Sequence, residues 1–429
     1  MTLVLVVLFG LMLLGIPVAF AILSAGMAYL ATTGGSMLVV AQRLIYGLNS
    51  FTLLAVPLFI LVGNLMDFGG ISKRLTDWAK SILGWLPGGL GIVTVFSCAI
   101  FAALTGSGPA TVAAIGSIML PSMLKAGYSR ETSAGLVASA GALGPIIPPS
   151  IPMIIYGVTM NLSIPAMFMA GVVPGLVIAL ALSLVNVIFA YRNPEVLKHA
   201  KTMKFDFKES MKLFWKALGA LGLPVLILGG IYGGIFTPTE SAAVGIVYAL
   251  ILGFALKELK VKDLPKILIN SLKTSTMVNF IIAAASLFSW VVSKSQIGTA
   301  ISNAFISFVG GSQALYLFVL VVVLLIVGCL MDNVAATLIL APILIPVGIA
   351  LGCNELHIGM LFCICLVVGF VTPPFGYNLF TAVSISGLNF KQIVKGALPF
   401  LLTEILLLFV FAYVPGIITW LPRLMGYGY

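Results

Sequence analysis

One pattern of helix-breaking residues occurs twice in this 429-residue chain, and the two copies are separated by about 225 positions. In the first copy, Thr105-Gly-Ser-Gly-Pro-Ala-Thr111 precedes Gly144-Pro-Ile-Ile-Pro-Pro-Ser150. In the second copy, Met331-Asp-Asn-Val-Ala-Ala-Thr337 precedes Gly369-Phe-Val-Thr-Pro-Pro-Phe375. The same separation aligns further breakers, namely Gly127 with Gly352, Pro121 with Pro346, Gly171 with Gly396 and Pro174 with Pro399. Paired Gly/Pro-interrupted segments in two halves are typical of membrane transporters whose site lies between structural repeats.

The composition of the chain points to a lipid environment. Hydrophobic residues make up 61% of the chain and charged residues only 8%, which is too little polar surface to cover a soluble core. Apolar runs of roughly 17 to 25 residues, the length that crosses about 30 Å of hydrocarbon, recur from Thr2 to Leu421. Because a helix satisfies its own backbone hydrogen bonds in lipid, we predict an all-α integral membrane protein. The first run, Leu3 to Leu14, has no basic residues before it, so we expect a retained span and not a secretory signal.

The positive charges indicate the topology. All but three of the 22 Lys and Arg residues lie in clusters between apolar runs, and the exceptions are Arg43, Lys294 and Arg423. If these clusters face the cytoplasm, the segment between Lys80 and Lys125 enters and leaves on the cytoplasmic side. We therefore predict a re-entrant hairpin over about 85–125, with its tip at 105–109. Its counterpart over about 314–354, with its tip at 331–334, starts and ends outside, so the two repeats have inverted topology.

We predict three parts along the chain. The first inverted repeat covers 1–191 and includes a broken transmembrane helix over about 130–158. A cytoplasmic linker covers 192–216, either as a solvated segment or with a surface amphipathic helix that uses Phe205, Phe207, Met211, Phe214 and Trp215. The second inverted repeat covers 217–429, with its broken helix over about 357–386, and both termini lie outside. The other expected elements are spans near 2–15, 16–34, 50–68, 164–191, 217–235, 238–256, 267–292 and 396–420, and arms near 70–82 and 294–309.

The tips and breaks carry the candidate chemistry. Backbone groups that lack helical partners at membrane depth are tolerated only inside protein or beside a wet cavity, where their carbonyl oxygens can bind a cation such as sodium. The first tip adds the hydroxyls of Thr105, Ser107 and Thr111, and its second arm begins near Pro109, where the positive helix end favours a carboxylate. In the second half, Asp332, Asn333 and Thr337 approach the break at Thr372-Pro-Pro374, with Tyr377 and Asn378 just beyond it. We expect both constellations to meet near the bilayer centre.

Three acidic residues have competing interpretations. Asp332 lies within an apolar stretch, where a carboxylate usually pairs with a cation or lines a pathway, although its position also permits a helix N-cap. Glu240 sits at a helix start and is expected to be a cap, whereas the role of Glu404, inside the last span, stays open. The sequence has no Walker A loop and no G-x-S-x-G elbow, which argues against an ATP-driven pump, a hydrolase or any other enzyme. The five scattered cysteines suggest neither a disulfide framework nor a transition-metal site.

The tip and break sequences also carry a family resemblance. Gly106-Ser-Gly-Pro-Ala-Thr-Val-Ala-Ala-Ile-Gly116, Gly144-Pro-Ile-Ile-Pro-Pro-Ser-Ile-Pro152 and Val371-Thr-Pro-Pro-Phe-Gly376 together resemble the large M, or DctM-type, subunit of tripartite ATP-independent periplasmic (TRAP) transporters. The resemblance covers essentially the whole chain and extends to sialic-acid M subunits. It implies a sodium-coupled elevator transporter of the bacterial inner membrane, with a small membrane Q subunit (DctQ-type) and a periplasmic substrate-binding P subunit as partners. No nucleic acid is expected to bind.

The resemblance further implies the positions of the ion and substrate sites. One sodium site is expected at Thr105, Ser107, Gly108, Gly144, Pro145 and Pro148, and a second at Asp332, Asn333, Gly369, Thr372 and Pro373. The substrate residues are expected to be Ser107, Thr111, Ser150, Asp332, Thr337 and Asn378. The implied substrate is a carboxylate-containing organic acid, either a C4-dicarboxylate or a sugar acid such as sialic acid. The alternative is a stand-alone sodium/dicarboxylate symporter or an ion antiporter of similar inverted-repeat architecture, which would need no binding protein.

Overall fold

The computed structural model describes residues 2–295 and 304–428, and every regular element in these two ranges is helical. The all-α prediction is therefore confirmed for this part of the chain. Short 3-10 helices are η1 (Thr52–Leu54), η2 (Gly141–Leu143) and η3 (Val261–Asp263). The α-helices are α1 (Thr2–Leu13), α2 (Val18–Thr33), α3 (Leu38–Leu48), α4 (Ala55–Phe68), α5 (Ile71–Leu83), α6 (Gly89–Thr105), α7 (Gly108–Lys125), α8 (Arg130–Ala140), α9 (Ile151–Met160), α10 (Ile164–Tyr191), α11 (Pro194–Thr202), α12 (Phe207–Tyr232), α13 (Pro238–Ala255), α14 (Leu264–Lys294), α16 (Gln313–Leu330), α17 (Asn333–Ala350), α18 (Glu355–Gly369), α19 (Tyr377–Ser386), α20 (Phe390–Tyr413) and α21 (Gly416–Leu424).

The described helices include enough membrane-crossing candidates for a multi-spanning protein. Seven of them are long and apolar enough to cross a bilayer, and there are eight if α3 and α4, which meet at a bend of 69°, form one span. Helix α1 has 12 residues and is about 18 Å long, which is well short of the roughly 30 Å of hydrocarbon. The element expected near 2–15 is present as α1, but α1 is not among the helices long enough to cross a bilayer by themselves, so a crossing at this segment stays a prediction.

The structure corrects three further boundaries. Helix α3 occupies a stretch between the expected spans at 16–34 and 50–68, where no element was expected. The expected span at 396–420 is instead α20 followed by the short α21, because Pro415 separates them. The expected linker at 192–216 contains α11, but its aromatic second part belongs to α12, which continues unbroken to Tyr232. The expected arm near 294–309 falls partly on residues 296–303, which lie outside the described residues.

Two pairs of consecutive helices are joined by very short turns. Helix α6 ends at Thr105, Gly106 adopts the left-handed conformation with φ of 60°, and α7 begins at Gly108. Helices α16 and α17 are separated only by Met331 and Asp332. The members of each pair pack against each other, so each pair is a helical hairpin.

Two other helices are interrupted near their midpoints. Helix α8 ends at Ala140 and α9 starts at Ile151, with η2 and the proline-rich segment between them. Helix α18 ends at Gly369 and α19 starts at Tyr377. The Pro148–Pro149 and Pro373–Pro374 bonds are both cis, so the two interruptions share this local geometry.

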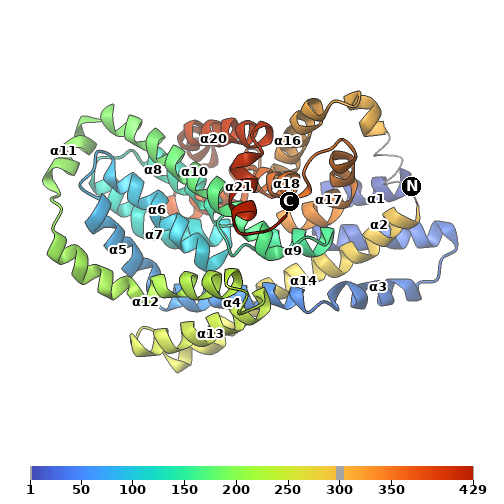
Figure 1. Ribbon diagram of the computed structural model, residues 1–429, viewed down its shortest axis with the longest axis horizontal. Helices are drawn as coiled ribbons and strands as arrows, with labels where there is room; N and C mark the ends of the chain where they lie inside the picture. The colour runs from blue at the N-terminus through green and yellow to red at the C-terminus, as the bar shows by residue number, and fades with distance from the viewer. Residues whose placement is uncertain (1, 296–303, 429) are drawn as a thin grey trace.

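The interrupted helices and hairpins lie together, and a row of long helices flanks them. In Figure 1, α4 and α14 lie in the lower part of the molecule with α13 below them, while α6, α7 and α8 lie at the left. Helix α14 packs against α2, α3, α4 and α17, and α8 packs closely against α20. The α8–α20 crossing depends on two glycines, because a Cβ atom at Gly396 would lie 1.9 Å from the carbonyl oxygen of Glu131 and one at Gly135 would lie 2.2 Å from the carbonyl carbon of Gly396.

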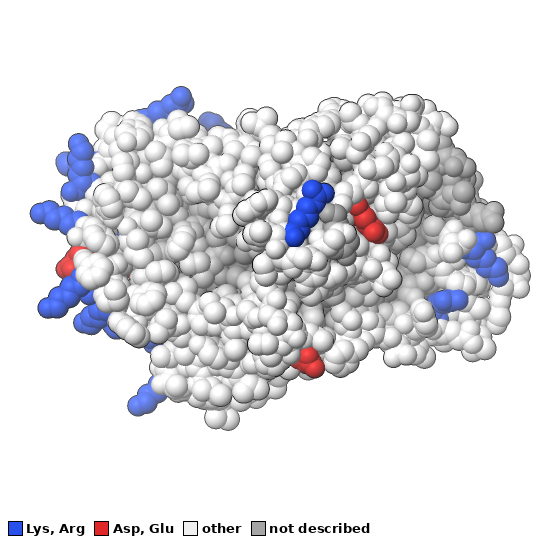
Figure 2. Space-filling view, in the orientation of Figure 1, with Lys and Arg blue, Asp and Glu red and all other residues white. Residues whose placement is uncertain are grey.

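The basic side chains are concentrated at one end of the molecule. Figure 2 shows Lys and Arg side chains gathered at the left end, where Figure 1 places α11 and the beginning of α12. The N-terminus lies towards the opposite end. The capping role expected for Glu240 is confirmed, since its Oε2 accepts from the Thr237 backbone N–H at 2.8 Å while its own N–H donates to Thr237 Oγ1 at 3.3 Å.

Candidate functional site

The first turn lies directly against the first interruption. A Cβ atom placed on Gly106 would be 2.8 Å from the carbonyl oxygen of Pro149, and one on Gly144 would be 2.6 Å from the carbonyl oxygen of Ser107. Such approaches leave room only for glycine. The backbone of the turn at 106–108 and that of the interruption at 141–150 therefore form one continuous polar surface inside the protein.

The hydroxyls of the first site are used in different ways. Thr111 Oγ1 donates to the carbonyl oxygen of Ser107 at 2.7 Å and lies 3.4 Å from Thr105 Oγ1. Ser150 is the N-cap of α9, and its hydroxyl donates to the carbonyl oxygen of Pro145. Ser107 occupies the N-cap position of α7, yet its side chain makes no capping hydrogen bond. The Ser107 hydroxyl is thus not used by its own helix.

Asn378 joins the two halves of the chain at this first site. The residue lies in the first turn of α19, beyond the second interruption, but its Nδ2 donates to the carbonyl oxygen of Ala138 at 3.0 Å. Its Oδ1 lies 2.8 Å from the position of a Cβ on Gly108, is buried, and has no hydrogen-bond partner in the described part of the chain. Buried amide oxygens normally have a partner, so this oxygen is available to a cation or to a donor group of a ligand. The sequence grouped Asn378 with the second site, and the structure places it at the first.

The second turn is organised around Asp332. Its Oδ1 accepts from the Val334 backbone N–H at 2.8 Å, which makes it the N-cap of α17, as one of the two sequence interpretations allowed. The carboxylate also lies close enough to Tyr377 for an electrostatic interaction. Asn333 and Thr337 follow on α17, and their side-chain polar atoms are buried without hydrogen-bond partners among the described residues. Buried orphan polar atoms of this kind mark a place where a ligand, ion or water is to be expected.

The second interruption brings carbonyl oxygens together. Gly376 has φ of 61°, and a Cβ on it would lie 2.9 Å from the carbonyl oxygen of Phe370 and 3.1 Å from that of Thr372. Thr372 Oγ1 donates to the carbonyl oxygen of Val368 at 3.0 Å. Gly369 packs against Gly328 of α16, where a Cβ would lie 2.4 Å from a backbone carbon. The carbonyl oxygens of Phe370 and Thr372 therefore both lie close to Gly376, and that of Phe370 accepts from the Asn378 backbone N–H at 3.0 Å.

A small polar cavity opens beside the first turn. Its volume is about 220 Å³, and Thr105 and Ser107 line it together with the α4 residues Gly63, Asn64 and Asp67. Asn64 Nδ2 donates to Ser271 Oγ of α14 at 2.8 Å, which holds α4 and α14 together at the cavity wall. Sequence reasoning did not assign Asn64 to a site. The signal was present, because Asn64 and Asp67 are three residues apart on one face of an otherwise apolar helix.

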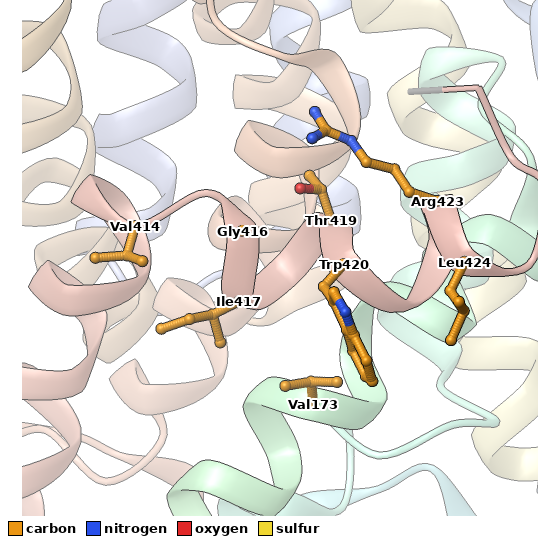
Figure 3. Close-up of a pocket in the computed structure, with 8 residues that line it drawn as sticks. All are labelled: Val173, Val414, Gly416, Ile417, Thr419, Trp420, Arg423 and Leu424. Carbon is orange, nitrogen blue, oxygen red and sulfur yellow. The ribbon is translucent and has the colours of Figure 1, made fainter.

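A larger hollow lies elsewhere, against the C-terminal helix α21. Its volume is about 730 Å³, and none of its lining residues belongs to the turns or the interruptions. Figure 3 shows Trp420 and Leu424 on the side of α21 that faces Val173 of α10, with Thr419 and Arg423 on the other side. Trp420 and Leu424 are largely exposed and Thr419 is buried, so this hollow is an apolar surface feature and not an ion-binding site.

A prediction at Asp332 separates its two roles. Asp332→Ala removes the cap and the charge, whereas Asp332→Asn keeps a side chain that caps helices equally well and removes only the charge. We expect the Ala variant to lose about 0.5 to 2 kcal/mol of stability and the Asn variant to stay close to wild type, as measured by thermal unfolding in detergent. If Asp332→Asn unfolds as early as Asp332→Ala, the carboxylate charge and not the cap stabilises the turn.

Comparison with known proteins agrees with the architecture. The solved structure of the YdaH transporter of Alcanivorax borkumensis matches with a TM-score of 0.60 at 14% sequence identity and covers 94% of this chain and 89% of that chain. The chain therefore shares the fold of that structure.

The sequence matches are more specific. A family model described as "Tripartite ATP-independent periplasmic transporter, DctM component" matches residues 5–417. The chain is 40% identical over 405 residues to the C4-dicarboxylate TRAP transporter large permease protein DctM of Pseudomonas aeruginosa, with 94% of each chain covered. It is also 40% identical over 411 residues to the isethionate TRAP transporter permease protein DctMQ of Oleidesulfovibrio alaskensis, where the match covers 95% of this chain but only 64% of that protein. The chain belongs to the DctM family, the large permease components of TRAP transporters, and is a multi-pass protein of the bacterial inner membrane.

Proposed function

We propose that this chain is the sodium-coupled translocation subunit that imports a carboxylate-containing organic acid delivered by a periplasmic binding protein. The observation that carries the proposal is the contact of the first turn with the first interruption, completed by the buried Oδ1 of Asn378. Exposed backbone carbonyls and half-helix ends are the groups that coordinate sodium in transporters with broken helices. The relatives named for C4-dicarboxylate and isethionate support an organic anion as the substrate.

The proposed mechanism is an elevator with two inverted repeats, 1–191 and 217–429, joined through 192–216. The α6–α7 and α16–α17 hairpins are taken as re-entrant, and with the two interrupted helices they form the moving part. The concentration of cations at one end supports a cytoplasmic assignment for that end, with the N-terminus on the periplasmic side. Sodium bound at the interruptions would order the turns and complete the anion site beside the positive end of α7. Such a cycle is transport and not enzymatic catalysis.

The proposed partners follow from the family. The DctMQ relative is a single protein that is longer than this chain, and its name combines M and Q. This supports a small Q-type membrane subunit as a partner of this chain. A periplasmic P subunit would deliver the substrate, and a sugar acid such as sialic acid remains within the proposed substrate class. The second candidate function, a stand-alone symporter or antiporter, is supported only by the fold shared with YdaH.

The test is uptake into proteoliposomes that contain this chain and its Q-type subunit under an imposed sodium gradient. Labelled C4-dicarboxylate, sialic acid and isethionate are each supplied with and without the cognate binding protein. Uptake that needs both sodium and the binding protein supports the proposal and names the substrate. Sodium-driven uptake without the binding protein moves the chain to the stand-alone symporters, and uptake that is independent of sodium overturns the sodium sites.

A prediction concerns the Ser107 hydroxyl, which lines the cavity and does not cap its helix. Removing one hydrogen-bonding or coordinating oxygen from a charged ligand is worth about 1.5 to 3 kcal/mol. Ser107→Ala should therefore raise the half-saturating sodium concentration by roughly tenfold to a hundredfold. The matched control is Ser117→Ala, an exposed serine on the same helix, which should leave sodium dependence unchanged. Equal sodium dependence in the two variants removes Ser107 from the ion site.

A further inference from the structure

A polar pocket lies at the cation-rich end of the molecule, between the arm helix α5 and the beginning of α12. Its volume is about 370 Å³. Residues of both charge signs line it, namely Lys80, Lys204, Asp77, Asp206 and Glu209. Lys80 Nζ also donates to Ser122 Oγ at 3.0 Å, and Asp206 Oδ1 caps α12 by accepting from the backbone N–H groups of Lys208 and Glu209. A pocket with both signs is suited to a ligand that itself carries both signs.

An apolar groove adjoins this pocket. The groove has a volume of about 900 Å³ and runs between α12 on one side and α6 and α10 on the other. Ser81 of α5 lines the polar pocket and the next residue, Ile82, lines the groove. Helix α12 also contributes to both, with Leu213 in the pocket and Leu221 in the groove. A charged pocket and a long apolar groove therefore lie beside each other along α5 and α12.

The chemistry of this site defines its occupant. We propose that it binds one phospholipid of the adjacent leaflet whose headgroup carries a phosphate and a primary ammonium, the chemistry of phosphatidylethanolamine. Its acyl chains lie in the groove, its phosphate meets Lys80 and Lys204, and its ammonium meets the carboxylates.

The carboxylates account for the selectivity among lipids. Three carboxylates face two ammonium groups, so a lipid with a net negative charge, such as phosphatidylglycerol, is disfavoured. A primary ammonium has three N–H donors for carboxylate oxygens, and the quaternary ammonium of phosphatidylcholine has none. The order of affinity is phosphatidylethanolamine, then phosphatidylcholine, then phosphatidylglycerol.

The groove also touches the candidate transport machinery. Ile147, in the first interruption, lines it along with the α6 residues Phe96 and Ala103. A bound lipid therefore contacts α12, the first hairpin and the interruption itself. The lipid would fill the groove between α12 on one side and α6 and α10 on the other, and it would be exchangeable for another lipid.

Native mass spectrometry of the full-length chain, with each of the three lipids added in detergent, tests the proposal. We expect one phosphatidylethanolamine to be retained per chain. The double variant Lys80→Ala, Lys204→Ala should weaken that retention by roughly thirtyfold, as expected when two lysines beside a headgroup are removed. The matched control is Lys198→Ala, Lys201→Ala, which removes two exposed cations of the neighbouring helix α11 that do not line the pocket.

Two more variants test the two ends of the site independently. Glu209→Gln with Asp77→Asn should abolish the preference for phosphatidylethanolamine over phosphatidylglycerol without loss of total lipid binding. Leu180→Trp, at an exposed groove position, should reduce retention of all three lipids because it fills the space for an acyl chain. Retention that is equal in the pocket and control variants, a wild-type preference for phosphatidylglycerol, or a cross-link from position 180 to the Q-type subunit that blocks lipid retention would each overturn the proposal.

Discussion

Gly144→Ala is expected to weaken the sodium dependence of uptake strongly. The new methyl group would lie 2.6 Å from the carbonyl oxygen of Ser107 and 2.9 Å from the backbone nitrogen of Gly108, so it forces the turn away from the interruption. Neither contact is with a flexible side chain that could rotate aside. Overpacking of this kind costs about 1 to 3 kcal/mol. If the contact forms the ion site, this energy appears as a rise of roughly fivefold to 150-fold in the half-saturating sodium concentration.

The control for this prediction is an exposed helical glycine with open space around it. Gly229 lies within α12 and has nothing within 4 Å of its Cβ position, so Gly229→Ala should support normal uptake. Both variants are measured in proteoliposomes at several sodium concentrations, after matching of reconstituted protein. A Gly144→Ala variant with wild-type sodium dependence would show that the turn and the interruption do not need to touch during transport.

Gly396→Ala is expected to cause the largest loss of stability. A Cβ at this position would lie 1.9 Å from the carbonyl oxygen of Glu131, which is far inside van der Waals contact. Helices α8 and α20 would have to separate along their whole crossing, and α8 carries the first interruption at its end. We expect a fall in stability of about 3 kcal/mol, at the upper end of overpacking effects, seen as an earlier thermal transition in detergent.

A double variant tests whether this loss comes from the crossing itself. Gly135 faces Gly396, so Gly135→Ala alone should also destabilise the protein. Once one methyl group has separated the helices, the second adds little, and the combined loss should be clearly smaller than the sum. Fully additive losses would indicate that the two glycines act at separate places and that the close crossing is not the cause.

The helical class and the places of the turns were accessible from sequence because glycine and proline act locally. Gly106 needs a left-handed conformation and Pro109 fits the first turn of a helix, so the position of the first turn follows from a few adjacent residues. The length of α1 and the independent helix α3 were not accessible in this way. Apolar composition indicates that a segment prefers lipid, but it does not determine where a helix bends or stops within the lipid.

The candidate site was only partly accessible for a different reason. The contact between the first turn and the first interruption follows from local sequence, because Gly106 and Gly144 each lie close to prolines and both belong to the same half of the chain. The position of Asn378 does not, since its partner Ala138 is 240 residues away and on the other half of the chain. Asn64 was missed because its neighbours on α14 are equally distant in sequence. Packing between distant parts of the chain brings these polar side chains to the site. The local sequence pattern carries no information about that packing.

If the two halves are repeats that arose by duplication, as proposed, the one-sided position of Asn378 has a consequence for how they diverged. The residue at the equivalent place in the first copy, about 225 positions earlier, is Met153, a fully buried methionine of α9 with no amide to offer. An ancestral pair of identical halves would have had two such bridges or none, so the present chain has broken its own symmetry. If sodium binds at both turns, as proposed, the two positions are chemically unequal, and sodium should fill them in sequence, with one filled at a lower concentration than the other.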